Sequence, residues 1–124
     1  MVAQEHGGII LNIGASTAIR GRINGINYCA SKAGVLVMTK CLALELAPKV
    51  RVNCIIPGLV WTEEAIDRFR LNDPEALKAR EEEIPLGHVG SPADIVEAAV
   101  FLMSDAAMYI NGQKIIIDGG QFMH

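Results

Sequence analysis

Three short apolar runs, set far apart along the chain, constrain the fold of this sequence most. They cover residues 7–13, 50–56 and 114–118, and glycine or proline follows each run closely. Such runs are typical of strands buried on both faces of a parallel sheet. Parallel strands need long crossover connections, and the intervening segments are long enough to supply helices. We therefore expect an α/β fold with about three parallel strands and crossover helices.

The segments between these runs carry helix signals of different kinds. Residues 27–47 predict one long helix, apolar around most of its circumference, which should be buried on several sides and which Pro48 ends. Residues 62–83 predict two short helices hinged at residues 72–74, a common construction for a lid. Ser91 followed by Pro92 predicts another helix start. Residues 14–25, rich in Gly, Ser, Thr and Asn, predict a loop beyond the first strand, where open α/β sheets bind ligands.

The composition is too apolar for a solitary domain of this size. The chain has 124 residues, of which 51% are hydrophobic and 20% charged, and its mean hydropathy is +0.30. A small domain leaves much of its surface in water. We therefore expect residues 1–124 to form a single partial domain that lacks a partner or a half. Disorder is excluded by the apolar content, and a disulfide scaffold by the presence of only three cysteines, which we expect to be buried (Cys29, Cys41 and Cys54).

Charge and segment length exclude other classes. The net charge of −3 argues against nucleic acid as a partner. Residues 62–83 hold eight acidic and four basic side chains, a pattern of a solvated helical segment or, alternatively, of a partner-binding one. No apolar run approaches the roughly 20 residues of a membrane span, and the amino-terminal residues lack the basic start of a signal peptide. We expect a cytoplasmic protein without membrane partners.

Tyr28 and Lys32 are the sharpest candidates for chemistry. Residues four apart share one face of a helix, so the lysine ammonium can approach the phenol. A tyrosine in water titrates at about pH 10, and a neighbouring cation stabilises its phenolate. Taken alone, the pair is more typical of a half-exposed tyrosine beside a solvated lysine than of a catalytic site.

The wider pattern gives the pair a context. In order and spacing, five segments together resemble the short-chain dehydrogenase/reductase family: GGIILNI (7–13), YCASKAG (28–34), LALELAP (42–48), RVNCIIPG (51–58) and IDGG (117–120). The resemblance covers nearly the whole chain. It implies the carboxyl-terminal half of a Rossmann-like, doubly wound parallel sheet, and an oxidoreductase that moves a hydride between NAD or NADP and a small-molecule alcohol or ketone.

The resemblance also implies roles for individual residues. Tyr28 would be the general acid and base, and Lys32 would assist it and bind the nicotinamide ribose. Pro57 and Gly58 would run beside the nicotinamide. The Val60 backbone would bind the carboxamide, and Thr62 would bind the cofactor phosphates.

Two departures from the family pattern stand out. The family's catalytic serine lies thirteen residues before the tyrosine, where this chain has Ala15; either a shifted loop presents Ser16 or Thr17, or the group is absent. The glycine-rich phosphate turn of a dinucleotide fold does not occur in the sequence. The alternative function is therefore a non-catalytic half-domain that pairs with a separate amino-terminal half or with its own copies as a homo-oligomer.

Other candidate residues carry weaker signals. His6, His88 and His124 show no metal-ligand spacing, so no metal is expected. Trp61 follows the second strand and predicts either a substrate-pocket wall or packing under the lid. Phe69 would add apolar surface to the same region.

Overall fold

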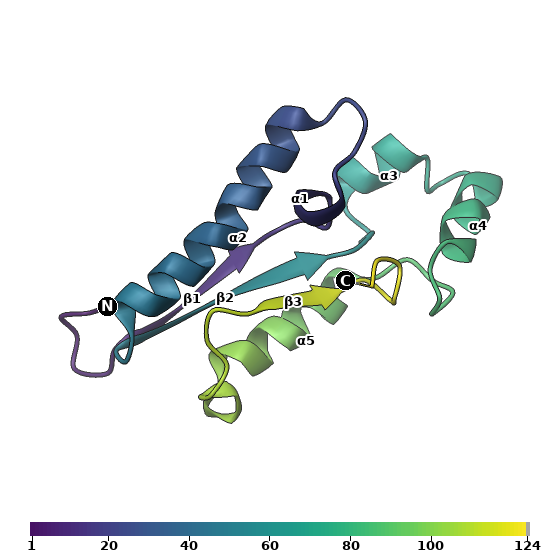
Figure 1. Ribbon diagram of the computed structural model, residues 1–124. Coiled ribbons are helices and arrows are strands. Elements are labelled where there is room, and N and C mark those ends of the chain that lie inside the picture. Colours follow the sequence, from purple (N-terminus) through teal and green to yellow (C-terminus); the bar gives the residue numbers. More distant parts are fainter. Residues whose placement is uncertain (124) are drawn as a thin grey trace.

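A computed structural model describes residues 1–123 and contains a parallel sheet of three strands (Figure 1). The strands are β1 (Gly8–Ile13), β2 (Val50–Pro57) and β3 (Lys114–Ile117), in the order β1-β2-β3. Gly8 lies opposite Val50, and Cys54 lies opposite Lys114. The α/β fold expected from the three apolar runs is confirmed, and all carboxyl ends of the strands lie at one edge of the sheet.

Helices cover both faces of this sheet (Figure 1). α2 (Ile26–Leu46) packs on one face, and α5 (Pro92–Met103), followed by the one-turn helix η1 (Asp105–Ala107), packs on the other. α3 (Glu63–Phe69) and α4 (Pro74–Glu82) stand beyond the carboxyl ends of the strands. The two short helices expected within residues 62–83 are therefore confirmed, with Pro74 opening the second.

Alternation along β2 gives each helix layer its own core. Val50 and Val52 point to the α2 face, where they pack with Ala43, and Ile55 points to the α5 face, where it packs with Leu102. These strand side chains are at most 1% exposed. Burying an aliphatic side chain of this size contributes about 1.5–3 kcal/mol to the free energy of unfolding. Because β2 supplies buried side chains to the cores on both faces of the sheet, it contributes to both.

Two asparagines join β2 to the segment before β3. The Asn53 amide donates to the Ile110 carbonyl at 2.8 Å, and its oxygen accepts the Gln113 N–H at 3.0 Å. Asn111 accepts the Val52 N–H at 2.8 Å and donates to the Ala43 carbonyl at 3.1 Å. Buried amides are stable only when bonded in this way, so these bonds fix how β3 enters the sheet.

The loop expected at residues 14–25 contains a turn of helix, α1 (Thr17–Arg20). Gly21 ends it, with φ at 73° and its N–H bonded to the Thr17 carbonyl at 2.9 Å. A left-handed residue favours glycine. The expectation of an irregular loop was wrong here because four residues are too few for a helical pattern to show.

α2 is less covered within this chain than its sequence led us to expect. Thr39 and Ala43 are its buried residues, whereas Val37 is 60% and Leu44 82% exposed. Cys41 is exposed and Cys29 only partly buried, so the expectation that all three cysteines are buried is confirmed for Cys54 alone. No helix in residues 1–123 is both long enough and apolar enough to cross a bilayer.

Candidate active site

Two adjoining cavities open at the carboxyl ends of β1 and β2. The first cavity has a volume of about 270 Å³ and includes Ser16 and Thr17 in its lining. The second cavity has a volume of about 280 Å³ and includes Val60 and Thr62. Both are lined by five common residues: Tyr28, Pro57, Gly58, Leu59 and Phe69.

Tyr28 stands in the first turn of α2, on the boundary of the two cavities. Tyr28 is 39% exposed, and the Arg22 guanidinium lies 4.7 Å from the centroid of its ring. A cation at this distance from an aromatic face is attracted to it. The phenol is therefore reachable from both cavities and lies beside a positive charge.

Lys32 lies one helical turn after Tyr28 and contacts the end of β1. Its Nζ donates a hydrogen bond to the Ile13 carbonyl at 2.8 Å. An ammonium has three N–H donors, so two remain for other acceptors. Lys32 is not among the residues that line either cavity, and its ammonium lies at the carbonyl of the last residue of β1.

The Pro57–Gly58 turn forms the floor common to both cavities. The Gly58 N–H donates to the Ile117 carbonyl at 2.8 Å. A Cβ at Gly58 would lie 2.6 Å from the Asp118 Cα, a distance at which atoms overlap. Glycine is therefore required for β2 to leave the sheet beside the end of β3.

Val60 and Thr62 offer polar groups to the second cavity. Val60 pairs with Gly90 through its neighbours, because Gly90 bonds to the Leu59 carbonyl and the Trp61 N–H. Within residues 1–123, no hydrogen bond is made by the N–H or carbonyl of Val60 itself. Thr62 caps α3 by accepting the Ala65 N–H at 3.2 Å, which leaves its O–H free to donate.

Three small residues follow β1 along the edge of the first cavity. Ala15, which stands where the family has a serine, lines it without a polar side chain. Ser16, 8% exposed, sits at the amino terminus of α1, and its side chain makes no capping hydrogen bond. The Thr17 hydroxyl is buried and has no hydrogen-bond partner within residues 1–123. Ser16 and Thr17 therefore line the cavity that Tyr28 also lines, although the Thr17 hydroxyl itself is closed to solvent.

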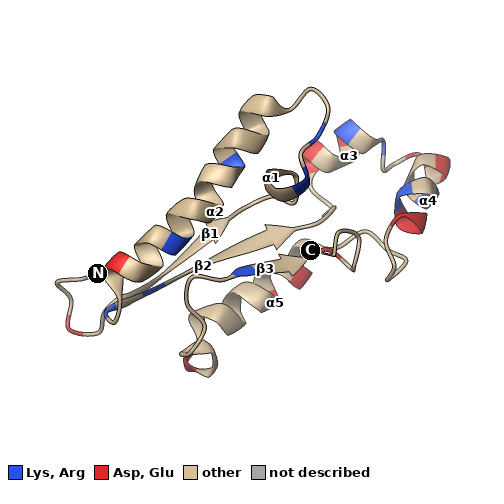
Figure 2. Cartoon of the chain, in the orientation of Figure 1, with Lys and Arg blue, Asp and Glu red and all other residues tan. Residues whose placement is uncertain are grey.

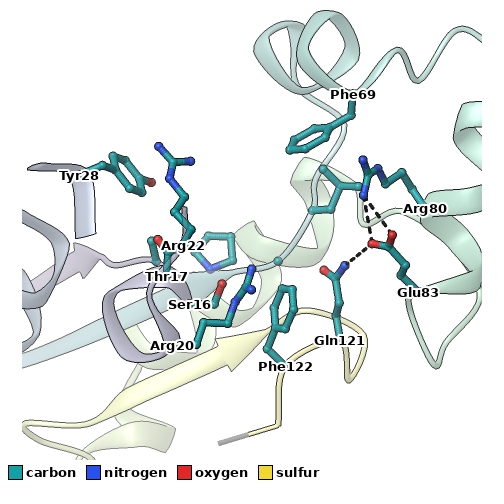
Figure 3. A pocket seen from close by; sticks show the side chains of 14 residues that line it. Ser16, Thr17, Arg20, Arg22, Tyr28, Phe69, Arg80, Glu83, Gln121 and Phe122 are labelled. Carbon is teal, nitrogen blue, oxygen red and sulfur yellow. Dashed lines mark hydrogen bonds and ion pairs between the residues drawn. The ribbon is translucent and has the colours of Figure 1, made fainter. Parts of the chain in front are cut away.

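The sequence interpretation missed the charged residues of the first cavity. Figure 3 shows Arg20 and Arg22 on the side of Tyr28, and Arg80 with Glu83 on the opposite side. Arg80 bonds both Glu83 oxygens, at 3.0 and 3.2 Å. The sequence shows two arginines close together at residues 20–22. That both side chains line the cavity follows only from the fold.

The remaining candidates fall outside both cavities. Trp61 packs against the core beneath α3 and α4, which contains Ala65 and Leu71. No group of three metal-binding side chains occurs in residues 1–123, and His124 lies outside the described residues. Burial raises the pKa of the Cys54 thiol, which keeps this cysteine neutral.

Comparison with known proteins decides the family. A family model described as enoyl-(acyl carrier protein) reductase matches residues 1–121. A solved short-chain dehydrogenase/reductase from Brucella melitensis superposes with a TM-score of 0.84 at 32% identity, covering 94% of this chain and 46% of that one. The chain belongs to the short-chain dehydrogenase/reductase family. The resemblance inferred from the five sequence segments is thereby confirmed.

Curated members of the family match the chain along its length. The L-rhamnose-1-dehydrogenase of Scheffersomyces stipitis is 40% identical over 125 residues, covering 100% of this chain and 48% of that protein. The 3-oxoacyl-[acyl-carrier-protein] reductase of Rickettsia felis is 40% identical over 121 residues, covering 97% of this chain and 48% of that protein. The chain thus spans about half the length of these relatives.

A third comparison concerns a structure with a cofactor. The 3-ketoacyl-(acyl-carrier-protein) reductase of Brucella melitensis, solved as a complex with NADH, is 37% identical and superposes with a TM-score of 0.80. It covers 93% of this chain and 45% of that one.

Proposed function

We propose that Tyr28 and Lys32 form the proton-transfer pair of an NAD(P)-dependent oxidoreductase acting on a small alcohol or ketone. The position of Tyr28 between the two cavities carries this proposal. On one side lie free backbone groups and the Thr62 hydroxyl; on the other lie the Ser16 and Thr17 hydroxyls. A phenol in this position can contact a substrate in the first cavity and a cofactor in the second.

The second cavity fits the nicotinamide end of a dinucleotide. The free N–H and carbonyl of Val60 match the donor and acceptor of a carboxamide, and the Thr62 O–H can donate to a phosphate. Relatives of this fold include one solved with NADH and one, from Beutenbergia cavernae and described as an NAD(P)-dependent gluconate 5-dehydrogenase, with bound NADP. Either cofactor is compatible with these groups.

The chain's own residues would move a proton at the substrate oxygen. A bound nicotinamide exchanges a hydride with the carbon that bears this oxygen. In reduction, the Tyr28 phenol gives its proton to the carbonyl oxygen; in oxidation, the phenolate takes the hydroxyl proton. Lys32, one helical turn after Tyr28, has two N–H groups for the ribose, while Ser16 or Thr17 donates a hydrogen bond to the substrate oxygen.

Titration of the purified chain with NADH and NADPH, followed by nicotinamide fluorescence, tests whether it binds a cofactor alone. Absence of binding by a folded sample would exclude autonomous catalysis. The proton-transfer pair is then tested in a chimaera in which this chain replaces the matching part of the Scheffersomyces stipitis enzyme. That chimaera supplies the remainder of a family member without altering the residues proposed for the site.

Tyr28→Phe is the decisive variant in the protein or chimaera that turns over. Phenylalanine keeps the ring and removes the proton, so kcat should fall by about 10²–10⁴-fold, as measured by nicotinamide absorbance. Tyr109→Phe is the matched control, since Tyr109 is fully exposed and is the chain's other tyrosine. Activity retained by Tyr28→Phe would reject the proposed role.

The exposed side of α2 favours a second candidate function, a half-domain that associates through this helix. Val37, Cys41 and Leu44 are all exposed and lie at spacings of four and three residues, hence on one helix face. The two functions are separated by the cofactor titration together with the state of association of the chain.

A further inference from the structure

The first cavity contains two arginines without a neutralising carboxylate. Arg20, Arg22 and Arg80 line it, and Glu83 is the one acidic residue in its lining. Glu83 is paired with Arg80. No carboxylate within residues 1–123 lies within 4.0 Å of Arg20 or Arg22. The cavity is therefore locally positive in a chain whose net charge is −3.

Arg20 is held by the segment that follows β3. Its guanidinium lies 3.8 Å from the centroid of the Phe122 ring. Phe122 is itself held, because its N–H donates to the Asp118 carboxylate at 2.7 Å, and the same carboxylate accepts the Gly120 N–H at 2.9 Å. A guanidinium stacked on an aromatic ring keeps its N–H edges free for an acceptor in the plane of the guanidinium.

Arg22 is held on the other side, between Tyr28 and the start of α2. Its side chain crosses Gly25 so closely that a Cβ there would overlap the Arg22 side chain. Its guanidinium stacks on the Tyr28 ring. Glycine at position 25 thus leaves room for the Arg22 side chain, whose guanidinium lies beside Tyr28 (Figure 3).

We propose that the alcohol or ketone handled at Tyr28 carries an anionic group, a carboxylate or a phosphate monoester, which Arg20 and Arg22 bind. The inference rests on the proposed function and adds a substrate class to it. Guanidinium groups match these anions in geometry and form charge-assisted hydrogen bonds. Acidic residues lie on α3 and α4 and also on α2 and α5 (Figure 2), but the one that lines the first cavity, Glu83, is already paired with Arg80.

Two matched probe pairs test the charge requirement. The first pair is 3-oxobutanoate and its methyl ester; the second is dihydroxyacetone phosphate and dihydroxyacetone. Binding is followed by the arginine side-chain Nε signals in ¹H–¹⁵N spectra, which do not depend on turnover. We expect the charged member of at least one pair to bind about tenfold or more tightly than its neutral partner, and the pair that discriminates distinguishes carboxylate from phosphate.

Arg20→Gln and Arg22→Gln then assign the effect to these side chains. Each variant should weaken binding of the preferred charged probe by about tenfold and leave the neutral probe unchanged. Arg70→Gln is the matched control, since Arg70 pairs with Asp73 just after the end of α3 and does not line the cavity. A shift of the arginine signals that both variants abolish would support direct contact.

Three results would overturn the inference. These are equal binding of charged and neutral probes, unchanged binding of the charged probe by both variants, and weakened binding of NADPH instead of the probes, which would assign the arginines to the cofactor. Failure of the proposed function looks different. In that case the charged probe binds through Arg20 and Arg22, but Tyr28→Phe leaves turnover intact.

Discussion

At the scale of single residues, the hydroxyl of Thr17 is the most informative atom. A buried hydroxyl without a partner costs about 1–3 kcal/mol, and that of Thr17 has none within residues 1–123. The cavity beside it is where a substrate oxygen would sit. Because the Thr17 hydroxyl is closed to solvent, an oxygen bound there would satisfy it only after a rotation of the Thr17 side chain. Ser16 stands one residue earlier and also lines the first cavity.

Thr17→Val tests the role of the unpaired Thr17 hydroxyl. Valine keeps the shape and removes the unpaired oxygen, so the free energy of unfolding should stay equal or rise. If Thr17 holds the substrate oxygen, kcat should fall by about 10²–10³-fold, while Thr17→Ser should restore most of it. Steady-state kinetics and urea unfolding give the two values. A loss of kcat in Ser16→Ala, with Thr17→Val unaffected, would assign the role to Ser16 instead.

At the scale of elements, the start of α5 shows how a local sequence defines a boundary. Asp94 accepts the Ser91 N–H at 2.6 Å and the Ser91 hydroxyl at 2.8 Å, and the Asp94 N–H donates back to the Ser91 oxygen at 3.3 Å. This reciprocal pair satisfies donors that a helix start leaves free. The backbone N–H of Ser91, followed by its hydroxyl, holds the pKa of Asp94 below its usual value.

This capping box predicts a pH dependence of stability. Because the folded-state pKa of Asp94 is lowered, its contribution is present above the unfolded value of about 3.9 and is lost as pH falls through the folded value. Asp94→Asn should therefore flatten the loss of stability in acid, and Ser91→Ala should cost about 1 kcal/mol at neutral pH. Urea unfolding across the acidic range measures both. The exposed Asp67→Asn in α3 is the control, and an acid profile unchanged in Asp94→Asn would contradict the assignment.

Elements with such local signals could be predicted from the sequence, and contacts between distant segments could not. The strands, the two short helices and the start of α5 follow from apolar runs, Pro74 and Ser91. The gathering of Tyr28 with the Pro57–Gly58 turn follows from the rule that parallel strands end at one edge. The stacking of Arg20 on Phe122 joins residues a hundred positions apart, and no local pattern encodes it.

At the scale of the whole molecule, the uncovered surfaces match the apolar composition. β1 pairs with β2 on one side only, so its other edge is free within residues 1–123. The face of α2 that carries Val37, Cys41 and Leu44 is exposed as well. Monomeric proteins rarely expose contiguous apolar surface. The chain spans about half the length of its relatives. A partner, if there is one, is therefore expected to cover the free edge of β1 and the exposed face of α2.

A second copy of the chain is the occupant that we propose for the α2 face when the chain is alone in solution. Sedimentation velocity should then show a mass that rises with protein concentration. Leu44→Lys should shift this rise to higher concentration, because Leu44 is 82% exposed and lies on the face proposed to pair. Leu86→Lys is the matched control, since Leu86 is also exposed but lies outside α2. A monomer at every concentration, or equal effects of both lysines, would show that the α2 face does not pair with its own copy.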